Sequence, residues 1–496
     1  MTAAVIALVM SMEVLCCTTV EVISSGRQYA ICTCRCFDKC VRRVSSNYVK
    51  HINRCFITPR ASKITLHETT LVTKKMKLIT SGFTAAWGKV SRLLTLQKQS
   101  QSVAIRVIYG QSNALGCIRG GAKPAPVYRK NPWPTQLLMP NSGIRMGLSR
   151  GGPVKRLNPE LTTGFIPLVS QGRAKGGQST SIAEGASWQI SAYCARVEKK
   201  VPRAVILNLA WGGRSIAALS PGGEIYEDAI RAIDRVCTLL EKDGYTPFVE
   251  YVDFDQGEAD SRSTHWASDV TSLRDRFNAD VKVRTKQEKA IPWLLAQPSA
   301  FLEGCYGMVV SQYALCKSKP NEFIQSGASY HLPFITDLLH RAEQGHALKG
   351  EFNGLSFART LYQRRADPVM QWNEVIYDES ANMLRLTPSI SVTQDKKINN
   401  PGNWGFNVYD GNDREVPILS VKTTGKGTQV VLLLAHAVLP GKNRRVDYAL
   451  NSKHQKKRVR YDDRPRGQLK SKHPFGLSYH SKTPLHAYMP HSREYF

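Results

Sequence analysis

Four short blocks of the sequence carry side chains whose types suit acyl transfer, and the first of them contains a serine. In residues 105–116, IRVIYGQSNALG, an apolar run typical of a buried strand leads directly into Gly-Gln-Ser-Asn. A serine hydroxyl attacks a carbonyl only after a neighbouring base has taken its proton. The stretch therefore has two interpretations: a turn that leaves a sheet, or a turn that presents Ser112 as a nucleophile.

A base for this serine is available in the block DLLH, residues 337–340. The imidazole of His340 suits proton transfer, and Asp337, three residues earlier, suits the acceptor that holds the ring in one tautomer. We therefore expect His340 to act as the catalytic base and Asp337 to orient it. His331 and His346 lie near the same block, and the sequence leaves them as alternative bases.

An acyl-transfer site also needs hydrogen-bond donors for the oxygen that becomes negatively charged. The block GGRS at 212–215 offers a backbone N–H at Gly213, and the block QGEAD at 256–260 offers the side-chain amide of Gln256. With the backbone N–H of Ser112 they make three expected oxyanion donors, and one such donor is worth about 3 to 4 kcal/mol in other enzymes. A glycine at 213 suits a loop whose backbone approaches a ligand closely.

Residues 101–365 alternate between two patterns. Apolar runs rich in β-branched residues predict strands at 103–109, 204–211, 247–254 and 306–313. Apolar residues at helical spacing predict helices at 182–200, 225–244, 265–281 and 345–362. Strands that alternate with helices indicate a parallel sheet covered on both faces, which holds ligands at the carboxyl ends of its strands. The four blocks lie at predicted strand ends or in the loops that follow, so we expect them to meet at this edge.

The remaining chain lies on either side of this α/β region. Residues 1–100 form an atypical extension, and the first 75 of them lack clear periodicity and are expected to be poorly ordered. After residue 365, short alternating runs separated by turn residues predict an all-β, sandwich-like module at 366–496. Its last 45 or so residues are rich in His, Lys, Arg, Pro and Tyr, and we expect them to be irregular.

Composition and charge narrow the classes of partner. The 496 residues are 42% hydrophobic and 22% charged, as in ordinary globular proteins, and carry a formal net charge of +29. That charge favours anionic partners. Neither zinc-finger spacing nor an RNA-binding aromatic signature occurs, and the basic residues are spread out, so no dedicated nucleic-acid binding is expected. The apolar residues 2–10 are too few to span a membrane, and no later apolar run is long enough either.

The cysteines are unevenly distributed. Seven of the twelve lie in the first 55 residues, among them Cys32, Cys34 and Cys36. Their spacing lacks the C-x2-C pairs of zinc sites, and no matching pair of histidines follows. The other five are scattered, as reduced or incidental thiols are. We therefore expect neither a metal nor any other cofactor.

The blocks GQSN (110–113), GGRSI (212–216), QGEAD (256–260) and DLLH (337–340) resemble, in order, those of the SGNH (GDSL-like) hydrolase superfamily. Gln256 stands where the superfamily has asparagine, which makes the chain similar to the sialate O-acetylesterase and carbohydrate acetylesterase branch. The resemblance implies a flavodoxin-like three-layer α/β/α domain. It also implies hydrolysis of O-acetyl esters on sugars through a serine nucleophile and an acetyl-enzyme, without a metal. The C-terminal β module is similar to the tail region of such esterases, and related domains occur in bacteriophage tail proteins.

Two positions depart from the pattern of this family. Within D-x-x-H the family usually has a glycine or another small residue followed by an apolar one, whereas this chain has the bulky pair Leu338 and Leu339. An apolar residue usually precedes the glutamine of the third block, whereas this chain has Asp255. The sequence offers no physical reason for that charge.

Four further side chains lie inside the blocks. Glu258 and Asp260 suit hydrogen bonds that hold the loop aiming Gln256. Asn113 either contacts the substrate or holds its own turn, and Arg214 either pairs with an acidic sugar or is solvated.

The expected partner is an O-acetylated polysaccharide or oligosaccharide of a bacterial surface, and the positive charge of the chain favours an acidic one. An extracellular or virion-associated protein fits this substrate better than a cytoplasmic one. The alternative is a catalytically idle sugar-binding or virion structural module on the same fold.

Overall fold

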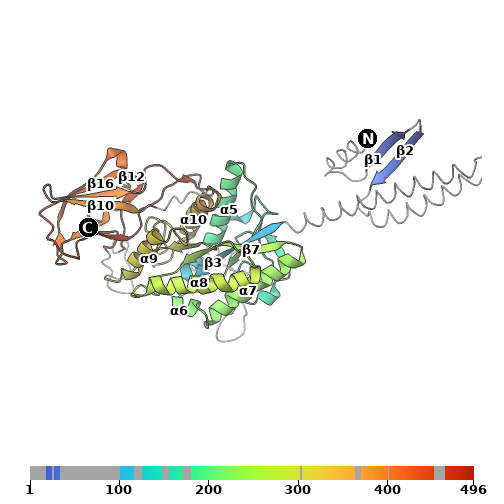
Figure 1. Ribbon diagram of the computed structural model, residues 1–496, viewed down its shortest axis with the longest axis horizontal. Helices are drawn as coiled ribbons and strands as arrows, with labels where there is room; N and C mark the ends of the chain where they lie inside the picture. Colours follow the sequence, from blue (N-terminus) through green and yellow to red (C-terminus); the bar gives the residue numbers. More distant parts are fainter. Residues whose placement is uncertain are drawn as a thin grey trace, which may run out of the picture. The chain divides into compact units, whose positions relative to one another are not determined.

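The fold is taken from a computed structural model, shown in Figure 1. It describes residues 18–24, 27–33, 101–116, 126–147, 156–170, 180–301, 304–363, 370–399, 401–451 and 464–496. The chain forms two compact units, Met1–Leu93 and Leu94–Phe496. In the first unit, β1 (Thr18–Ser24) pairs antiparallel with β2 (Arg27–Thr33). This hairpin was not predicted, because the sequence shows no clear periodicity there. The rest of the N-terminal extension lies outside the described residues. The expectation that it is poorly ordered therefore stays a prediction.

A seven-stranded sheet forms the centre of the second unit, in the order β5-β4-β6-β3-β7-β8-β9. Every neighbouring pair is parallel except β4 with β5. Its strands are β3 (Ser102–Gly110), β4 (Leu137–Pro140), β5 (Phe165–Pro167), β6 (Ala204–Asn208), β7 (Thr246–Asp255), β8 (Trp293–Ala296) and β9 (Phe323–Gln325). In chain order, the five strands from β6 to β9 read 2-1-3-4-5, the order of flavodoxin-like doubly wound sheets. The α/β class predicted from the alternating pattern is therefore confirmed.

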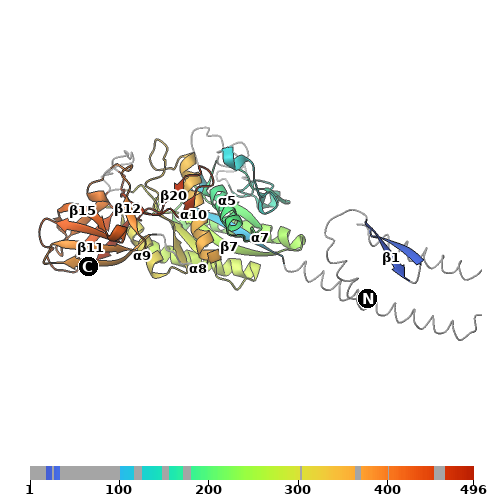
Figure 2. The same cartoon turned by 90° about the horizontal axis from the view of Figure 1, so that it is seen from above.

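Helices cover both faces of this sheet (Figures 1 and 2). The helices α5 (Ile182–Arg196) and α10 (Glu343–Gln363) pack together on one face. The other face packs against α7 (Glu224–Lys242), α8 (Trp266–Thr285) and α9 (Gly307–Ser318). The side chains of β3 point alternately to the two faces of the sheet: Ile105 and Val107 face the α7–α8 side, whereas Ala104 and Ile108 face the α5 side. Two short helices, α4 (Ser112–Leu115) and α6 (Ile216–Leu219), follow β3 and β6.

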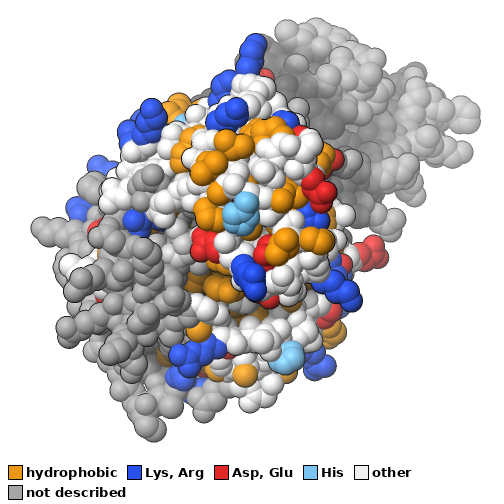
Figure 3. Space-filling model, turned by 90° about the vertical axis from the view of Figure 1, so that its left-hand side faces the viewer, with side chains coloured by type: hydrophobic (Ala, Val, Ile, Leu, Met, Phe, Trp, Pro, Cys, Tyr) orange, Lys and Arg blue, Asp and Glu red, His pale blue; other side chains and the backbone are white. Residues whose placement is uncertain are grey.

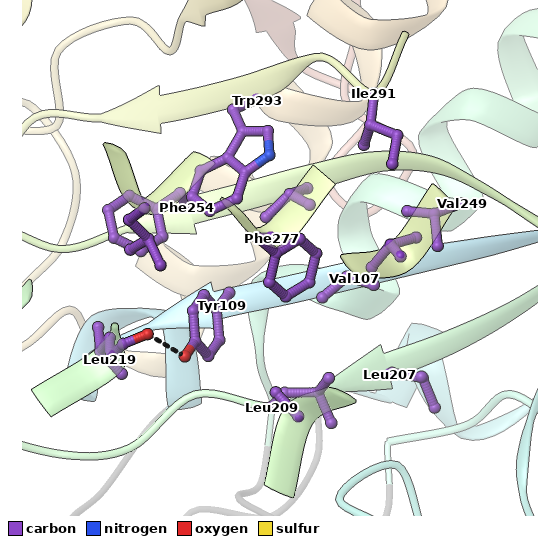
Figure 4. Close-up of a cluster of buried hydrophobic side chains, with 14 of the residues drawn as sticks. Val107, Tyr109, Leu207, Leu209, Leu219, Val249, Phe254, Phe277, Ile291 and Trp293 are labelled. Carbon is purple, nitrogen blue, oxygen red and sulfur yellow. Dashed lines mark hydrogen bonds between the residues drawn. The ribbon is translucent and has the colours of Figure 1, made fainter. Parts of the chain in front are cut away.

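The core on the α7–α8 side is built around aromatic rings (Figure 4). Tyr109 at the end of β3 packs between Phe254 of β7 and Phe277 of α8, with ring centroids 6.0 and 5.8 Å away. Its hydroxyl donates to the carbonyl of Leu219 at 2.7 Å, so the buried polar group is satisfied. This packing fixes the end of β3 directly before the turn that carries Ser112.

The close contact between α5 and α10 depends on glycine. A Cβ atom at Gly350 would lie 2.3 Å from the carbonyl oxygen of Ile182, and one at Gly354 would lie 2.3 Å from that of Ala186. The amino end of α5 is closed by a capping box between Ser181 and Glu184. These contacts hold α10 against α5, and α10 begins at Glu343, three residues after His340 of the D-x-x-H block.

The strand predicted at 306–313 is wrong, because this segment begins helix α9. The run contains adjacent valines, which favour strands, but its buried side chains recur at helical spacing: Met308, Val309, Gln312 and Tyr313. The strands at this side of the sheet are instead β8 and β9, only four and three residues long. The other three predicted strands and all four predicted helices are confirmed, with ends shifted by a few residues.

Residues 370–496 form strands and short turns wherever the structure describes them, as the alternating pattern predicts. One four-stranded sheet has the order β10-β11-β16-β15 and another the order β14-β13-β17-β21. Their bounds are β10 (Trp372–Asp378), β11 (Met383–Pro388), β13 (Phe406–Tyr409), β14 (Glu415–Val416), β15 (Ile418–Thr424), β16 (Gln429–Leu434), β17 (Arg445–Tyr448) and β21 (Ser492–Tyr495). Side chains of both sheets, such as Leu384 and Leu432 of one and Phe406 and Val446 of the other, share a single apolar core.

The expectation that the last 45 or so residues are irregular is met only in part where they are described, because short strands interrupt the irregular segments and β21 completes a sheet there. Three shorter strands precede it: β18 (Leu469–Ser471), which pairs with β12 (Val392–Gln394), and β19 (Gly476–Leu477), which pairs with β20 (Pro484–Leu485). Figure 3 shows apolar side chains gathered on this end of the molecule. The exposed large apolar residues of the two sheets and their loops are Ile376, Leu419, Leu433, Leu439 and Tyr495.

Buried polar contacts join the β module to the α/β region. The side-chain amide of Gln297 donates to the carbonyl of His491 at 3.0 Å and accepts from its N–H at 3.0 Å. The N–H of Trp372 donates to the hydroxyl of Tyr313 on α9 at 2.9 Å. The boundary proposed at residue 366 therefore separates two parts of one compact unit, and their independence stays a prediction. None of the described helices is both long and apolar enough to cross a membrane.

His491 predicts a measurable loss of stability in acid. Burial lowers the pKa of this fully buried imidazole to about 4, below its ordinary value of 6.5. Between these two values the unfolded chain binds a proton that the folded chain refuses, so the unfolding free energy falls as pH drops from 6.5 towards 4. At pH 5 this single group lowers the unfolding free energy by about 2 kcal/mol.

Urea unfolding of the parent and of His491→Gln at pH 7.5 and pH 5.0 checks this prediction. We expect the stability difference between the two pH values to be smaller in the variant by about 2 kcal/mol. Other titrating groups are common to both proteins and cancel in the comparison. An identical pH dependence in both would contradict the assignment.

Candidate active site

The turn that carries Ser112 is fixed by the strand next to it. β3 ends at Gly110, whose φ of +127° favours glycine, and a Cβ atom there would lie 2.3 Å from the carbonyl oxygen of Asp255. The N–H of Gln111 donates to that same carbonyl at 2.9 Å. Ser112 then opens the short helix α4 and is 8% exposed. The serine thus lies at the carboxyl ends of the two central strands.

Ser112, His340 and Asp337 lie in one hydrogen-bonded line. Nε2 of His340 is 2.9 Å from Oγ of Ser112, and Nδ1 of His340 is 2.7 Å from Oδ2 of Asp337. A carboxylate can only accept, so Nδ1 carries the ring proton and Nε2 accepts from the serine hydroxyl. The arrangement has the contacts that a serine nucleophile, its base and the group orienting the base require.

Asp337 is held as a carboxylate by its own loop. Burial raises the pKa of this group, but hydrogen bonds outweigh that effect, so its pKa lies below the usual value. Its Oδ1 accepts from the N–H groups of Leu339 at 3.0 Å and His340 at 2.9 Å, in addition to the imidazole on Oδ2. A charged Asp337 stabilises the imidazolium that forms when His340 takes a proton.

The unusual Leu338 lies at a strained position of this loop. Its φ is +56°, in the left-handed region that costs a bulky L-residue about 1 to 2 kcal/mol relative to the right-handed one. This conformation explains why a glycine or another small residue suits this place in D-x-x-H. The loop keeps it because Asp337 binds the two N–H groups that follow Leu338.

The structure separates the three candidate histidines. His346 is fully buried on α10, neither of its ring nitrogens has a partner, and burial holds its pKa well below the ordinary range. His331 stacks on Tyr488 at a centroid distance of 3.7 Å, away from the serine. His340 is the histidine that contacts Ser112.

Two expected oxyanion donors have unused N–H groups. Among the described contacts, the main-chain N–H groups of Ser112 and Gly213 are not donated to any other group of the protein. Gly213 is exposed, its φ is +69°, and nothing lies within 4 Å of a Cβ atom built on it. The turn itself therefore favours glycine at 213. The close approach of this backbone to a ligand stays a prediction. The N–H of Trp211 donates to the carbonyl of Gly110 at 2.9 Å, which brings this loop beside the serine turn.

Gln256, the third expected donor, has its amide engaged. Its Nε2 donates to the carbonyl of Arg214 at 3.2 Å and to the carboxylate of Asp260, and its Oε1 accepts from Nε1 of Trp266 at 2.9 Å. Asp260 also accepts from the N–H of Ile216 at 2.9 Å. Asp260 therefore ties the Gln256 side chain to the start of α6, and Gln256 must exchange an acceptor before it can donate to an oxyanion.

Glu258 and Asn113 hold the serine turn. The carboxylate of Glu258 accepts from Nε2 of Gln111 and, at 2.7 Å, from Nδ2 of Asn113. Nδ2 of Asn113 also donates to the carbonyl of Leu339 at 3.2 Å, which links this turn to the histidine loop. Burial and then the charge of Asp255 raise the pKa of Glu258 to about 7. Asn113 thus holds its turn, and Arg214 is exposed to solvent. A contact of either side chain with a substrate stays a prediction.

Replacing Glu258 by alanine is expected to lower kcat about tenfold to a hundredfold, as for other residues that orient catalytic groups. The change leaves the buried amide of Gln111 without its acceptor and that of Asn113 with only the carbonyl of Leu339, so the serine turn loosens. The measurement is ester hydrolysis by purified protein with an unchanged circular dichroism spectrum. Glu227→Ala, at an exposed position of α7, is the control that should keep full activity. Equal rates for both variants would show that Glu258 does not position the site.

Arg341 is a site residue that sequence reasoning missed. It follows His340 directly, is 2% exposed, and its Nη2 pairs with the carboxylate of Asp255 and donates to the carbonyl of Asn113 at 3.0 Å. Its main-chain N–H donates to Oδ1 of Asn113 at 3.2 Å. Arg341 therefore connects the base loop, the serine turn and the end of β7, and it accounts for the charge at position 255. The only signal in the sequence was an unexplained arginine after one block and an unexplained aspartate before another.

Among the described residues, no three His, Cys, Asp or Glu side chains are grouped as metal ligands. No protein-family model matches the chain, and no curated protein matches it. Solved structures with a similar course of the chain include a carbohydrate acetylesterase from Xanthomonas citri, at 16% identity and a TM-score of 0.48 over 79% of this chain and 80% of that one. NanS matches at 14% identity and a TM-score of 0.37, over 53% of this chain and 98% of its own. A tail fiber protein of an Escherichia coli phage matches at 10% identity and a TM-score of 0.30, over 71% and 35%.

Proposed function

We propose that this chain is a serine carbohydrate O-acetylesterase of the SGNH type. The observation that carries the proposal is the line from Oγ of Ser112 through His340 to Asp337, at the carboxyl edge of a parallel sheet. The order of the four sequence blocks supports the same reaction and supplies the substrate class.

In the first half of the reaction, Ser112 attacks the acetyl carbonyl while Nε2 of His340 takes its proton. The developing oxyanion is stabilised by the N–H groups of Ser112 and Gly213, and by Gln256 once its amide exchanges Asp260 or Arg214 for the oxyanion. His340 then gives the proton to the sugar oxygen, the ester bond breaks, and the deacetylated sugar leaves an acetyl-Ser112 enzyme.

In the second half, water takes the place of the sugar. His340 removes a proton from this water, which attacks the acetyl carbonyl, and the same donors hold the second oxyanion. The serine leaves with the proton from His340, and acetate is released. Asp337 keeps the ring in the required tautomer and stabilises the imidazolium in both halves.

The net charge of +29 supports an acidic or phosphorylated glycan as substrate. We expect the exposed Arg214, next to the expected oxyanion donor Gly213, to pair with an acidic substituent. Rates on matched neutral and anionic O-acetylated glycans, at low and high salt, test this part. Equal rates on both at low salt would remove the preference for acidic substrates.

The decisive experiment combines labelling with product analysis. A fluorophosphonate probe should label the full chain at Ser112, located by peptide mass spectrometry, and O-acetylated bacterial polysaccharide should release acetate in the presence of the protein. Labelling without acetate release would indicate an esterase with a different substrate. A folded protein with neither reaction would favour the alternative, an idle sugar-binding or virion structural module.

A further inference from the structure

A cavity of about 130 Å³ lies apart from the serine site, between the start of α10 and the strand β20 region of the C-terminal chain. Its wall is largely apolar and includes Leu348, Phe352 and Leu485. Four titratable side chains also line it: His331, Lys349, His486 and Tyr488. None of the residues of the hydrogen-bonded line at Ser112 takes part in this wall.

Lys349 is a buried amine that forms no ion pair with a described carboxylate. It is 1% exposed, and its Nζ donates to the carbonyl of Gly327, another residue of the cavity wall, at 2.5 Å. No described carboxylate lies within ion-pair distance of this nitrogen. The nearest carboxylates are otherwise engaged: Asp253 accepts from Asn353, and Asp255 pairs with Arg341. A buried ammonium group with one neutral partner favours an anionic ligand, because burying an unpaired charge is costly.

Two further features concern the groups that such a ligand would contact. Burial, and then the charge of Arg341, lower the pKa of Lys349 to about 7, so an anion bound beside it would restore the charged form. The ring of His331 stacks on Tyr488, and its buried Nδ1 has no hydrogen-bond partner. Burial lowers the pKa of His331 to about 3, so the ring is neutral and offers a hydrogen bond rather than a second charge.

We propose that this cavity binds a small monocarboxylate with an apolar body, whose carboxylate pairs with Lys349. The volume of about 130 Å³ is close to the roughly 150 Å³ of a dry cavity in another protein that holds benzene, so the apolar body of the ligand is at most about the size of a benzene ring. The apolar wall suits the body of the ligand, and the lysine supplies the single charge. The site does not depend on the proposed esterase activity. Benzoate and butyrate should fill it better than acetate, which leaves most of the apolar wall uncovered.

The test is calorimetric titration of the full chain carrying Ser112→Ala with sodium benzoate, at constant ionic strength. Benzamide, an uncharged molecule of the same shape, is the control ligand. We expect benzoate to bind at least tenfold more tightly than benzamide. Lys349→Met, which keeps the length of the side chain without the charge, should remove this preference. Lys289→Met, at an exposed position, should retain it.

A second variant keeps the test meaningful if Lys349→Met fails to fold. Ala328→Leu places a larger side chain in the cavity wall and leaves the lysine itself in the chain, and it should abolish benzoate binding. Absence of benzoate binding to the parent, or binding that survives both substitutions, would overturn the proposal. Neither result would affect acetate release by Ser112, so the two proposals fail separately.

Discussion

Replacing Ser112 by alanine is expected to lower kcat for acetate release by at least about 10⁴-fold, because the acetyl-enzyme can no longer form. Among the described residues, the Ser112 hydroxyl at 2.9 Å is the only group that Nε2 of His340 contacts, so no neighbouring side chain takes over its role. KM should change little, since the substituted atom contributes little to binding of the ground state. Initial rates of acetate release from an O-acetylated glycan, with the protein at equal concentration, measure the effect.

Two controls separate loss of the nucleophile from general damage. Ser220→Ala removes a serine hydroxyl that donates only to the carbonyl of Ile216, at 2.8 Å, and should retain activity. The double variant Ser112→Ala with His340→Ala should be no slower than Ser112→Ala alone, because the two residues act as one unit. Activity of Ser112→Ala within tenfold of the parent would refute the assigned nucleophile.

Breaking the buried pair between Asp255 and Arg341 is expected to destabilise the protein by about 3 to 5 kcal/mol, as removal of one partner leaves the other charge unpaired. Asp255 is 1% exposed and Arg341 is 2% exposed, so water cannot compensate either charge. Since Arg341 follows His340 and binds Asn113 beside Ser112, kcat should fall along with stability. Urea unfolding and acetate release of Asp255→Asn and Arg341→Gln measure the two effects.

The double variant Asp255→Asn with Arg341→Gln tests whether the two charges stabilise the protein through each other. It removes both charges, so it should be less destabilised than the sum of the single variants. A role in positioning His340 predicts that kcat falls more than KM rises in each single variant. It also predicts that Arg341→Lys, which keeps the charge, recovers part of the activity. Single variants with parental stability and kcat would show that the pair contributes neither.

Local patterns were enough to predict most long elements and the residue types of the site. Helices such as α7 and α8, and strands such as β3 and β7, bury side chains at spacings that are visible within one turn or one strand. A serine after a strand and the D-x-x-H block named Ser112 and His340, because few side chains can act as nucleophile and base. The segment at 306–313 was wrongly predicted as a strand, because a short apolar run suits a strand and a buried helix equally well.

The pairings that make the site depend on the order of the strands. Ser112 and His340 are 228 positions apart, and their contact exists because β3 and β7 lie side by side at the centre of the sheet, below the loop that precedes α10. In the same topology His340, and not His331 or His346, contacts Ser112, Glu258 contacts the serine turn, and Asp255 pairs with Arg341. Side-chain periodicity is set by neighbours along the chain, so the sequence by itself determined the elements and the chemistry they carry. Only the tertiary structure decided which charges and hydrogen bonds meet, because those contacts form between strand ends and loops that sequence spacing does not relate.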